Sequence, residues 1–353
     1  MEELVTQARR TGSPVVEDNR ATFVWLGDAP PEVIGDFNGF GRGRPQIILG
    51  EQAPGVWAQT VEFPRDAYIE YLYRVNGETG LDPLNPRRVG NGIGGRHSYF
   101  FMPAAEQTPL ARVRRDVPRG TLTRTVVKND YLLIGGRRVV HLYRPPVDTP
   151  VPLLVVFDGQ DYLPRARIVH ILDNLIAQKR IRPIAMALVS HGNQARFIEY
   201  DCSDATVSWL LRDVIPLAGE QMPLIDPAAE PGAFGVLGAS MGGLIALYTA
   251  MRVPGVFGHV ISQSGAFGLH SGSLRPVVWD LVYHAASQPL KIWMDAGEYE
   301  FLKESNREMQ ALLAEKGYDV QYREYAGGHN YTSWKNDVWR GLEAVFAPGY
   351  TDH

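Results

Sequence analysis

Short segments with alternating apolar and polar residues dominate about the first hundred positions of the chain. A period of two is typical of half-buried β-strands. The clearest segments are 21–26, 32–36, 56–63, 68–75 and 97–102. Asn76-Gly77 follows the fourth of them and predicts a tight turn. This spacing predicts a small all-β sandwich of the immunoglobulin type.

After residue 120 the pattern changes to apolar runs that alternate with helical periodicity. Such runs are typical of parallel strands buried on both faces. They cover 151–159, 184–189 and 234–239, and we expect further strands over 259–264, 290–295 and 320–325. We expect helices over about 165–179, 207–215 and 302–316 and from Trp334 onward. Pro216 should bend or end the second of these helices.

The alternating segments 122–127 and 138–144 predict an antiparallel hairpin at the edge of this sheet. Because strands and helices alternate, we predict a mostly parallel, doubly wound α/β sheet. We therefore expect a sandwich domain over 1–103, a solvated, arginine-rich linker over 104–120 and an α/β domain over 121–353.

Composition narrows the class of protein. Hydrophobic residues make up 45% of the 353 positions and charged residues 21%, as in globular proteins. The net charge of −4 predicts no general attraction to nucleic acid or to an anionic membrane. No apolar run reaches the roughly 20 residues of a membrane span. A lone Cys202 and an acidic N-terminus without a leader pattern favour the cytoplasm.

One glycine-rich segment carries candidate chemistry. Gly238-Ala239-Ser240-Met241-Gly242 lies between an expected strand and an expected helix. A nucleophile elbow needs this order, with small neighbours around a strained serine. The alternative is an ordinary glycine-rich turn. The flanking elements favour Ser240 as a nucleophile.

A base and an acid should follow neighbouring strands, because active groups of doubly wound sheets gather at the strand C-termini. His329 follows the last strand in Gly327-Gly328-His329 and is our candidate base. The other eight histidines lack this setting, although His191 follows a strand end and could touch substrate. Asp295, Glu298 and Glu300 compete as the acid, and periodicity does not choose among them. The order Ser, acid, His is that of α/β-hydrolases.

An oxyanion hole requires two backbone N–H groups. Met241, directly after the serine, should supply one. The loop 158–161 should supply the other, from Gln160 or, as second choice, from Gly159. The side chain of Asp158 is expected to fix this loop. We expect no metal and no cofactor, because no zinc-type cluster of Cys and His occurs.

Several segments together resemble a known family. They are residues 157–162, 196–200, 238–243 and 297–300, and Gly327-Gly328-His329-Asn330 with Trp334. The chain resembles the enterochelin esterase group of the esterase D branch of α/β-hydrolases. Residues 33–40, 71–77 and 82–86 resemble an early-set immunoglobulin-like module.

The resemblance implies a serine esterase that hydrolyses a ferric catecholate siderophore and releases iron. In the family register the acid falls on Glu300. Such a small-molecule ester is anionic, so basic residues should line its pocket. Arg196, Arg96 and the neighbouring His97 are candidates, with Trp334 and His191 as further substrate contacts.

Two other functions compete. A carbohydrate-linked feruloyl or acetyl esterase would be expected to carry an export signal. A non-catalytic binding protein that works through its N-terminal module would be expected to lack one member of the triad. Ser240, His329 and an acid are all present.

Overall fold

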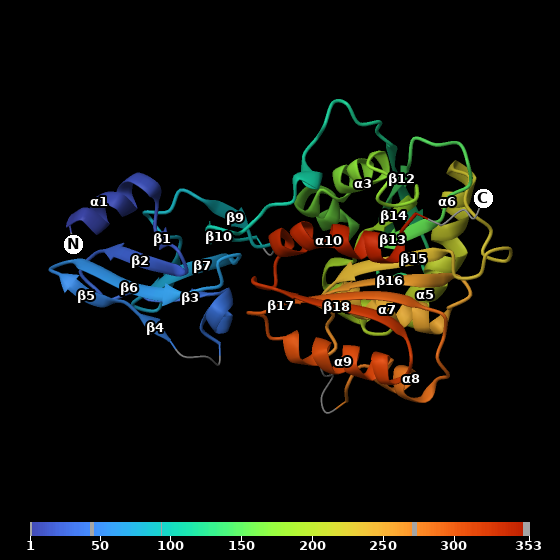
Figure 1. Cartoon of the computed structure of the whole chain (residues 1–353). Helices are drawn as coiled ribbons and strands as arrows, with labels where there is room; N and C mark the ends of the chain where they lie inside the picture. Colours follow the sequence, from blue (N-terminus) through green and yellow to red (C-terminus); the bar gives the residue numbers. More distant parts are fainter. Residues whose placement is uncertain (1, 43–45, 93, 270–273, 349–353) are drawn as a thin grey trace. The chain divides into compact units, whose positions relative to one another are not determined.

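The computed structural model describes residues 2–42, 46–92, 94–269 and 274–348, and its chain divides into two compact units (Figure 1). The first unit comprises residues up to 107 and two short later segments, Gly297–Phe301 and Glu324–Ser333. The second unit comprises the remainder. Within the described ranges, no helix combines the length and the apolar character that crossing a bilayer requires.

The first unit is a β-sandwich preceded by helix α1 (Glu2–Thr11). Its strands pair antiparallel in two sheets, with orders β1-β2-β6-β5 and β4-β3-β7-β10-β9, and β8 pairs with β7. The strands are β1 (Val15–Glu17), β2 (Arg20–Leu26), β3 (Glu32–Gly35), β4 (Ile47–Ile48), β5 (Gly50–Ala53), β6 (Val56–Glu62), β7 (Tyr68–Val75), β8 (Glu78–Gly80), β9 (Arg88–Gly90) and β10 (Arg96–Phe101).

Aromatic residues from both sheets fill the interior of the sandwich. Phe23 lies 5.1 Å from Tyr71 and 5.8 Å from Phe100, each in an edge-on arrangement. Aromatic rings prefer this geometry, which adds to the burial of their apolar surface. Asn76 and Gly77 both have positive φ and form the predicted turn between β7 and β8.

The second unit is built on a large mixed sheet with the order β11-β12-β14-β13-β15-β16-β17-β18. The edge hairpin β11–β12 is antiparallel, whereas β14, β13, β15, β16 and β17 run parallel. The strands are β11 (Thr121–Lys128), β12 (Arg137–Arg144), β13 (Leu153–Val156), β14 (Ala185–Val189), β15 (Phe234–Ala239), β16 (Phe257–Gln263), β17 (Lys291–Gly297) and β18 (Asp319–Tyr325).

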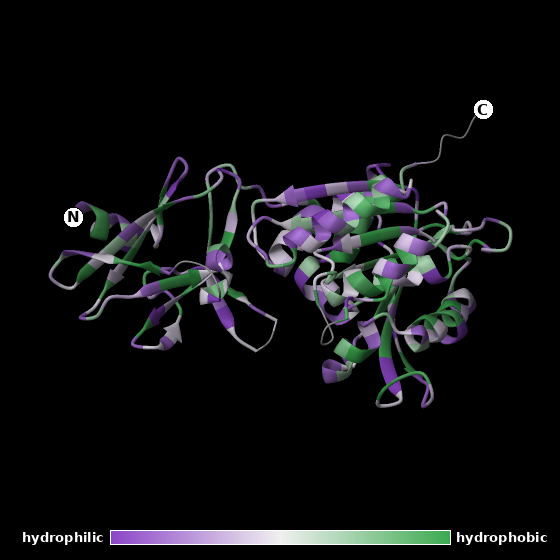
Figure 2. Ribbon diagram, turned by 90° about the horizontal axis from the view of Figure 1, so that it is seen from below, coloured by the Kyte–Doolittle hydropathy of each residue, from purple (hydrophilic) through white to green (hydrophobic). Residues whose placement is uncertain are grey.

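The central strands are wholly buried and mostly apolar, as the continuous runs predict (Figure 2). Helices cover both faces of the sheet (Figure 1). One face carries α3 (Ile168–Ala177) and α10 (Tyr331–Val345), and the other α7 (Met241–Arg252), α8 (Val278–His284) and α9 (Lys303–Glu315). The shorter helices are α2 (Gly159–Asp161), α4 (Arg196–Tyr200), α5 (Asp204–Trp209) and α6 (Ile215–Gln221). The predicted doubly wound α/β-hydrolase sheet, preceded by an all-β sandwich, is confirmed.

Two local expectations need correction. Pro216 does not end its helix, because it occupies the first turn of α6, where the missing N–H has no intrahelical acceptor. A π-helical turn over Leu210–Val214, directly before the proline, interrupts the regular α-helix and joins α5 to α6. The arginine-rich segment is also not fully solvated. Leu110 is 4% exposed, and its carbonyl accepts a hydrogen bond from the Asn174 amide on α3.

Candidate active site

Ser240 lies at a sharp strand-to-helix turn in the second unit. It follows β15 directly, and its φ of 59° and ψ of −122° are strained for a residue with a side chain. A Cβ atom at Gly238 would lie 2.3 Å from the backbone of Gly242, so only glycine fits there. The first residue of α7 is Met241, and the first N–H groups of a helix have no intrahelical acceptor. The segment therefore has the geometry of a nucleophile elbow.

The loop after β13 has a fixed conformation. Asp158 adopts a positive φ of 55°, and its carboxylate accepts two hydrogen bonds from Arg196, at 2.8 and 2.6 Å. This bidentate pair holds the loop, as expected for Asp158. Gln160 follows in the short helix α2, and its side-chain oxygen accepts a hydrogen bond from the backbone N–H of His191. The loop thus offers its N–H groups from a rigid turn.

Glu300 and His329 lie together in the first unit. His329 Nδ1 is 2.5 Å from Glu300 Oε2, and Gly297 N–H donates to the other carboxylate oxygen at 2.6 Å. A carboxylate can only accept, so Nδ1 carries the proton and Nε2 is left as the basic nitrogen. The Glu300 side chain is fully buried, whereas 26% of the imidazole is exposed. This pair has the orientation that a general base and its acid require.

The two competing carboxylates are arranged differently. Asp295 is fully buried in the second unit, where one of its oxygens accepts hydrogen bonds from Gln263 and from the Trp293 indole. Glu298 is exposed. The hydrogen bond described above pairs Glu300 with His329.

Comparisons with known proteins show the family of the chain. Residues 133–344 match the family described as "Putative esterase". That match covers more than half of the chain. The chain belongs to this esterase family. It is a carboxylic ester hydrolase, and the expected resemblance to the enterochelin esterase group is confirmed by the relatives that follow.

The iron(III) enterobactin esterase of Dickeya dadantii is 29% identical over 84% of this chain and 71% of its own length. Among solved structures, the ferric enterobactin esterase of Salmonella typhimurium superposes with a TM-score of 0.77 at 21% identity, over 92% of this chain and 93% of that one. The enterobactin esterase of Shigella flexneri, crystallised with enterobactin, gives a TM-score of 0.74 at 22% identity, over 92% of each chain.

The esterase holds the remaining predicted contact residues in varied settings. Arg196 is tied to Asp158, and Arg96 is exposed on β10. His191 is half-buried, and burial lowers its pKa, which favours the neutral imidazole. Trp334 is 5% exposed, and its indole N–H donates to Ser264. His270 and His353, two histidines without a predicted role, lie outside the described residues.

A basic groove lies beside the loop that follows β14. Its volume is about 570 Å³, and its lining includes Arg124, Arg137, Arg138 and His191. Arg138 is buried against Glu199. Arg124 and Arg137 are exposed, and within the described part of the chain neither makes an ion pair. The groove therefore carries two positive charges that no ion pair among the described residues neutralises. The alternating pattern of the edge strands did not predict this groove.

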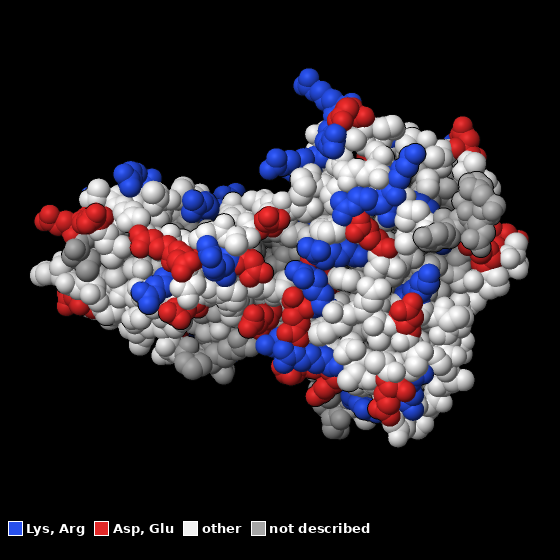
Figure 3. Space-filling model, in the orientation of Figure 1, with Lys and Arg blue, Asp and Glu red and all other residues white. Residues whose placement is uncertain are grey.

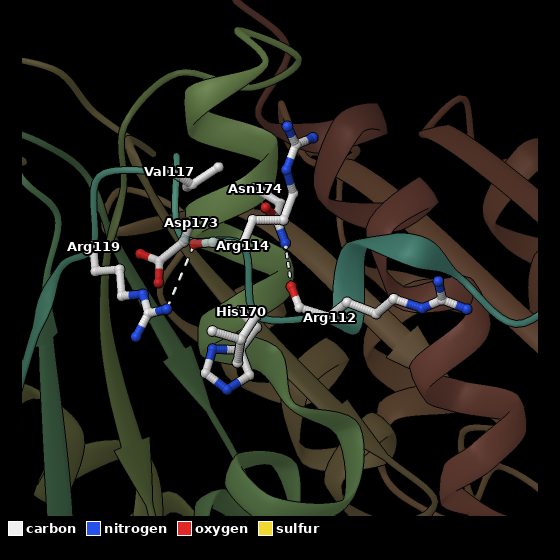
Figure 4. Close-up of a pocket in the computed structure, with 8 residues that line it drawn as sticks. Arg112, Arg114, Val117, Arg119, His170, Asp173 and Asn174 are labelled. Carbon is white, nitrogen blue, oxygen red and sulfur yellow. Dashed lines mark hydrogen bonds between the residues drawn. The ribbon is translucent and has the colours of Figure 1, made fainter.

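A second cavity is too small to hold an ester. It encloses about 10 Å³ beside α3, which is room for about one water molecule (Figure 4). Arg112, Arg114 and Arg119 point away from one another there, and the carbonyl of Arg112 accepts a hydrogen bond from Asn174.

Elsewhere, acidic and basic side chains are interspersed on the visible face of each unit (Figure 3). Among the described residues, no group of three or more His, Cys, Asp or Glu side chains could hold a metal.

Proposed function

We propose that this esterase hydrolyses the ester bonds of a ferric catecholate siderophore of the enterochelin type, through Ser240, His329 and Glu300, and so releases the bound iron. The observation that carries the triad is the hydrogen bond between His329 Nδ1 and the buried Glu300. It pairs a base with an acid in the loops after β18 and β17, in the chain order of an α/β-hydrolase.

The reaction follows from these groups. Ser240 Oγ attacks the ester carbonyl while His329 Nε2 takes its proton, and Glu300 stabilises the resulting imidazolium. The N–H groups of Met241 and Gln160 donate to the oxyanion. When the intermediate collapses, His329 returns the proton to the leaving alcohol. Water then attacks the acyl-enzyme by the same route and regenerates Ser240.

The substrate class rests on the relatives and on charge. Iron(III) enterobactin esterases match most of this chain. The groove with Arg124 and Arg137 is linked to the oxyanion loop, because His191 lines it and binds Gln160. A ferric tri-catecholate is anionic, and unpaired guanidinium groups attract such a ligand.

One experiment tests both parts of the proposal. Wild type and Ser240→Ala are incubated with iron-loaded enterobactin, methyl ferulate and p-nitrophenyl acetate, and the products are separated by chromatography. We expect wild type to prefer enterobactin. We expect Ser240→Ala to lose about 10⁴-fold or more in kcat on every substrate, as when a triad nucleophile is removed.

The outcomes separate the chemistry from the substrate. Activity that survives in Ser240→Ala would refute the triad. Faster cleavage of methyl ferulate than of enterobactin by wild type would refute the siderophore and favour a carbohydrate-linked esterase, with the triad intact.

A further inference from the structure

The segments that carry Glu300 and His329 belong to the same compact unit as the N-terminal sandwich. Their contacts with it are specific. The backbone N–H of Tyr68, at the start of β7, donates to the carbonyl of Ala326 at 3.0 Å. The ring of Tyr299 packs edge-on against Phe63 at 6.2 Å, and both Tyr299 and Ala326 extend the core of the sandwich. The two segments are also joined to each other, because Tyr299 N–H donates to the Gly327 carbonyl.

One side chain of the sandwich lies directly against the residue before His329. A Cβ atom at Gly328 would be 2.0 Å from Asp36 Oδ1 and 2.1 Å from Asp36 Cγ. The carboxyl group of Asp36 therefore occupies the space that any side chain at position 328 would need. Gly328 is required here by this close approach, since its φ is not positive.

Asp36 is itself held firmly. It is 6% exposed, and its Oδ2 accepts a hydrogen bond from the backbone N–H of Glu70 at 2.8 Å. The turn that contains it is fixed by Asn38, whose side-chain oxygen accepts from Gly35 N–H and whose amide donates to the Val33 carbonyl. A buried side chain with so many constraints is a rigid support.

Asp36 is also unusual for a support. Burial, together with the nearby carboxylates of Glu70 and Glu300, raises its pKa well above the ordinary value. An apolar side chain would fill the same space at lower cost, but it would leave the Glu70 N–H without this acceptor.

We propose that Asp36 is a positioning residue for ester hydrolysis: its carboxyl group seats Gly328 and so holds the His329 imidazole in register with Glu300. This inference rests on the proposed role of His329 as the base. The sandwich is then a structural part of the catalytic apparatus, because it supplies the surface against which the loop carrying His329 packs.

Substitutions at position 36 test the support. Asp36→Ala removes the contact and is expected to lower kcat on p-nitrophenyl acetate by about 10²-fold with KM nearly unchanged, because a displacement of about 1 Å costs that much. Asp36→Asn keeps the shape and the acceptor for Glu70 N–H, and it should stay within about threefold of wild type. The matched control is Asp82→Asn, at a buried carboxyl of the sandwich that accepts from Tyr71. It should destabilise the unit and leave kcat unchanged.

A reciprocal pair tests the contact itself. Gly328→Ala should clash with Asp36 and lower kcat by about 10²-fold. Adding Asp36→Gly removes the clashing atoms and should restore about tenfold of that loss. A double variant no more active than Gly328→Ala, or an Asp36→Ala enzyme with wild-type kcat, would overturn the proposal. Loss of activity in Ser240→Ala and His329→Ala, measured alongside, keeps that result distinct from a failure of the triad.

Discussion

At the scale of single residues, Asp36 combines burial with two acidic neighbours. Glu70 and Glu300 face it, Tyr68 and His97 contact Glu70, and His329 contacts Glu300. The raised pKa of Asp36 means that the folded protein binds a proton more tightly there than the unfolded chain does. The stabilising effect is complete below the unfolded pKa of about 3.9 and is lost as the pH rises through the higher folded value.

Asp36→Asn removes this titration, which gives a test by pH. The melting temperature of wild type should fall relative to that of Asp36→Asn as the pH is raised from 4 to 8. A divergence of about 2 °C or more is expected, the shift that about 1 kcal/mol causes in a domain of 150–250 residues. Melting curves followed by circular dichroism measure the difference. Parallel curves across this range would contradict a raised pKa at Asp36.

Individual residues differ in how far the sequence could specify them. The motifs around Ser240 and His329 identify both as candidates, because an elbow and a Gly-Gly-His loop are local patterns. Glu300 could be separated from Asp295 and Glu298 only by family register, since spacing says nothing about which carboxylate reaches the imidazole. The positioning role of Asp36 could not be predicted from the sequence, because its contact with Gly328 joins residues almost three hundred positions apart.

At the scale of elements, the edge hairpin β11–β12 carries the charge that the proposed substrate needs. We expect the Arg124→Ala and Arg137→Ala double variant to raise KM for iron-loaded enterobactin about tenfold, which corresponds to about 1.4 kcal/mol. Its kcat on p-nitrophenyl acetate should stay unchanged, since that ester is neutral. Steady-state kinetics at low salt measures both, because salt screens exposed charges.

Arg144→Ala provides the matched control. Arg144 lies on β12, the strand that also carries Arg137, but it pairs with Asp148. Its removal should therefore leave KM for enterobactin unaltered. An equal KM in the double variant and in wild type would remove the groove from the substrate site.

The elements themselves were largely predictable. The buried strands of the large sheet stand out as apolar runs, and the alternating segments gave the main strands of the sandwich. The shortest strands, such as β4 and β9, have too few residues for any period to emerge. Pro216 left a bend and an end of the helix both open, because a proline in the first turn of one helix looks, in sequence, like the end of another.

At the scale of the whole molecule, the sandwich should be indispensable even for a substrate that it does not bind. A chain that begins at residue 108 keeps the large apolar core of the second unit but lacks the surface on which Tyr299 and Ala326 pack. We expect it to retain cooperative unfolding and to lose about 10²-fold or more in kcat on p-nitrophenyl acetate. Full activity in this truncated chain would instead assign the sandwich a separate binding role.

The division of the chain also has a consequence for its synthesis. The sandwich, up to residue 107, is made before the two later segments that complete its unit, at residues 297–301 and 324–333. Domains generally begin to fold as they emerge. The nascent chain therefore carries Ser240 before the proposed base, His329, has been made, and we expect it to hydrolyse esters only after residue 333 has been translated.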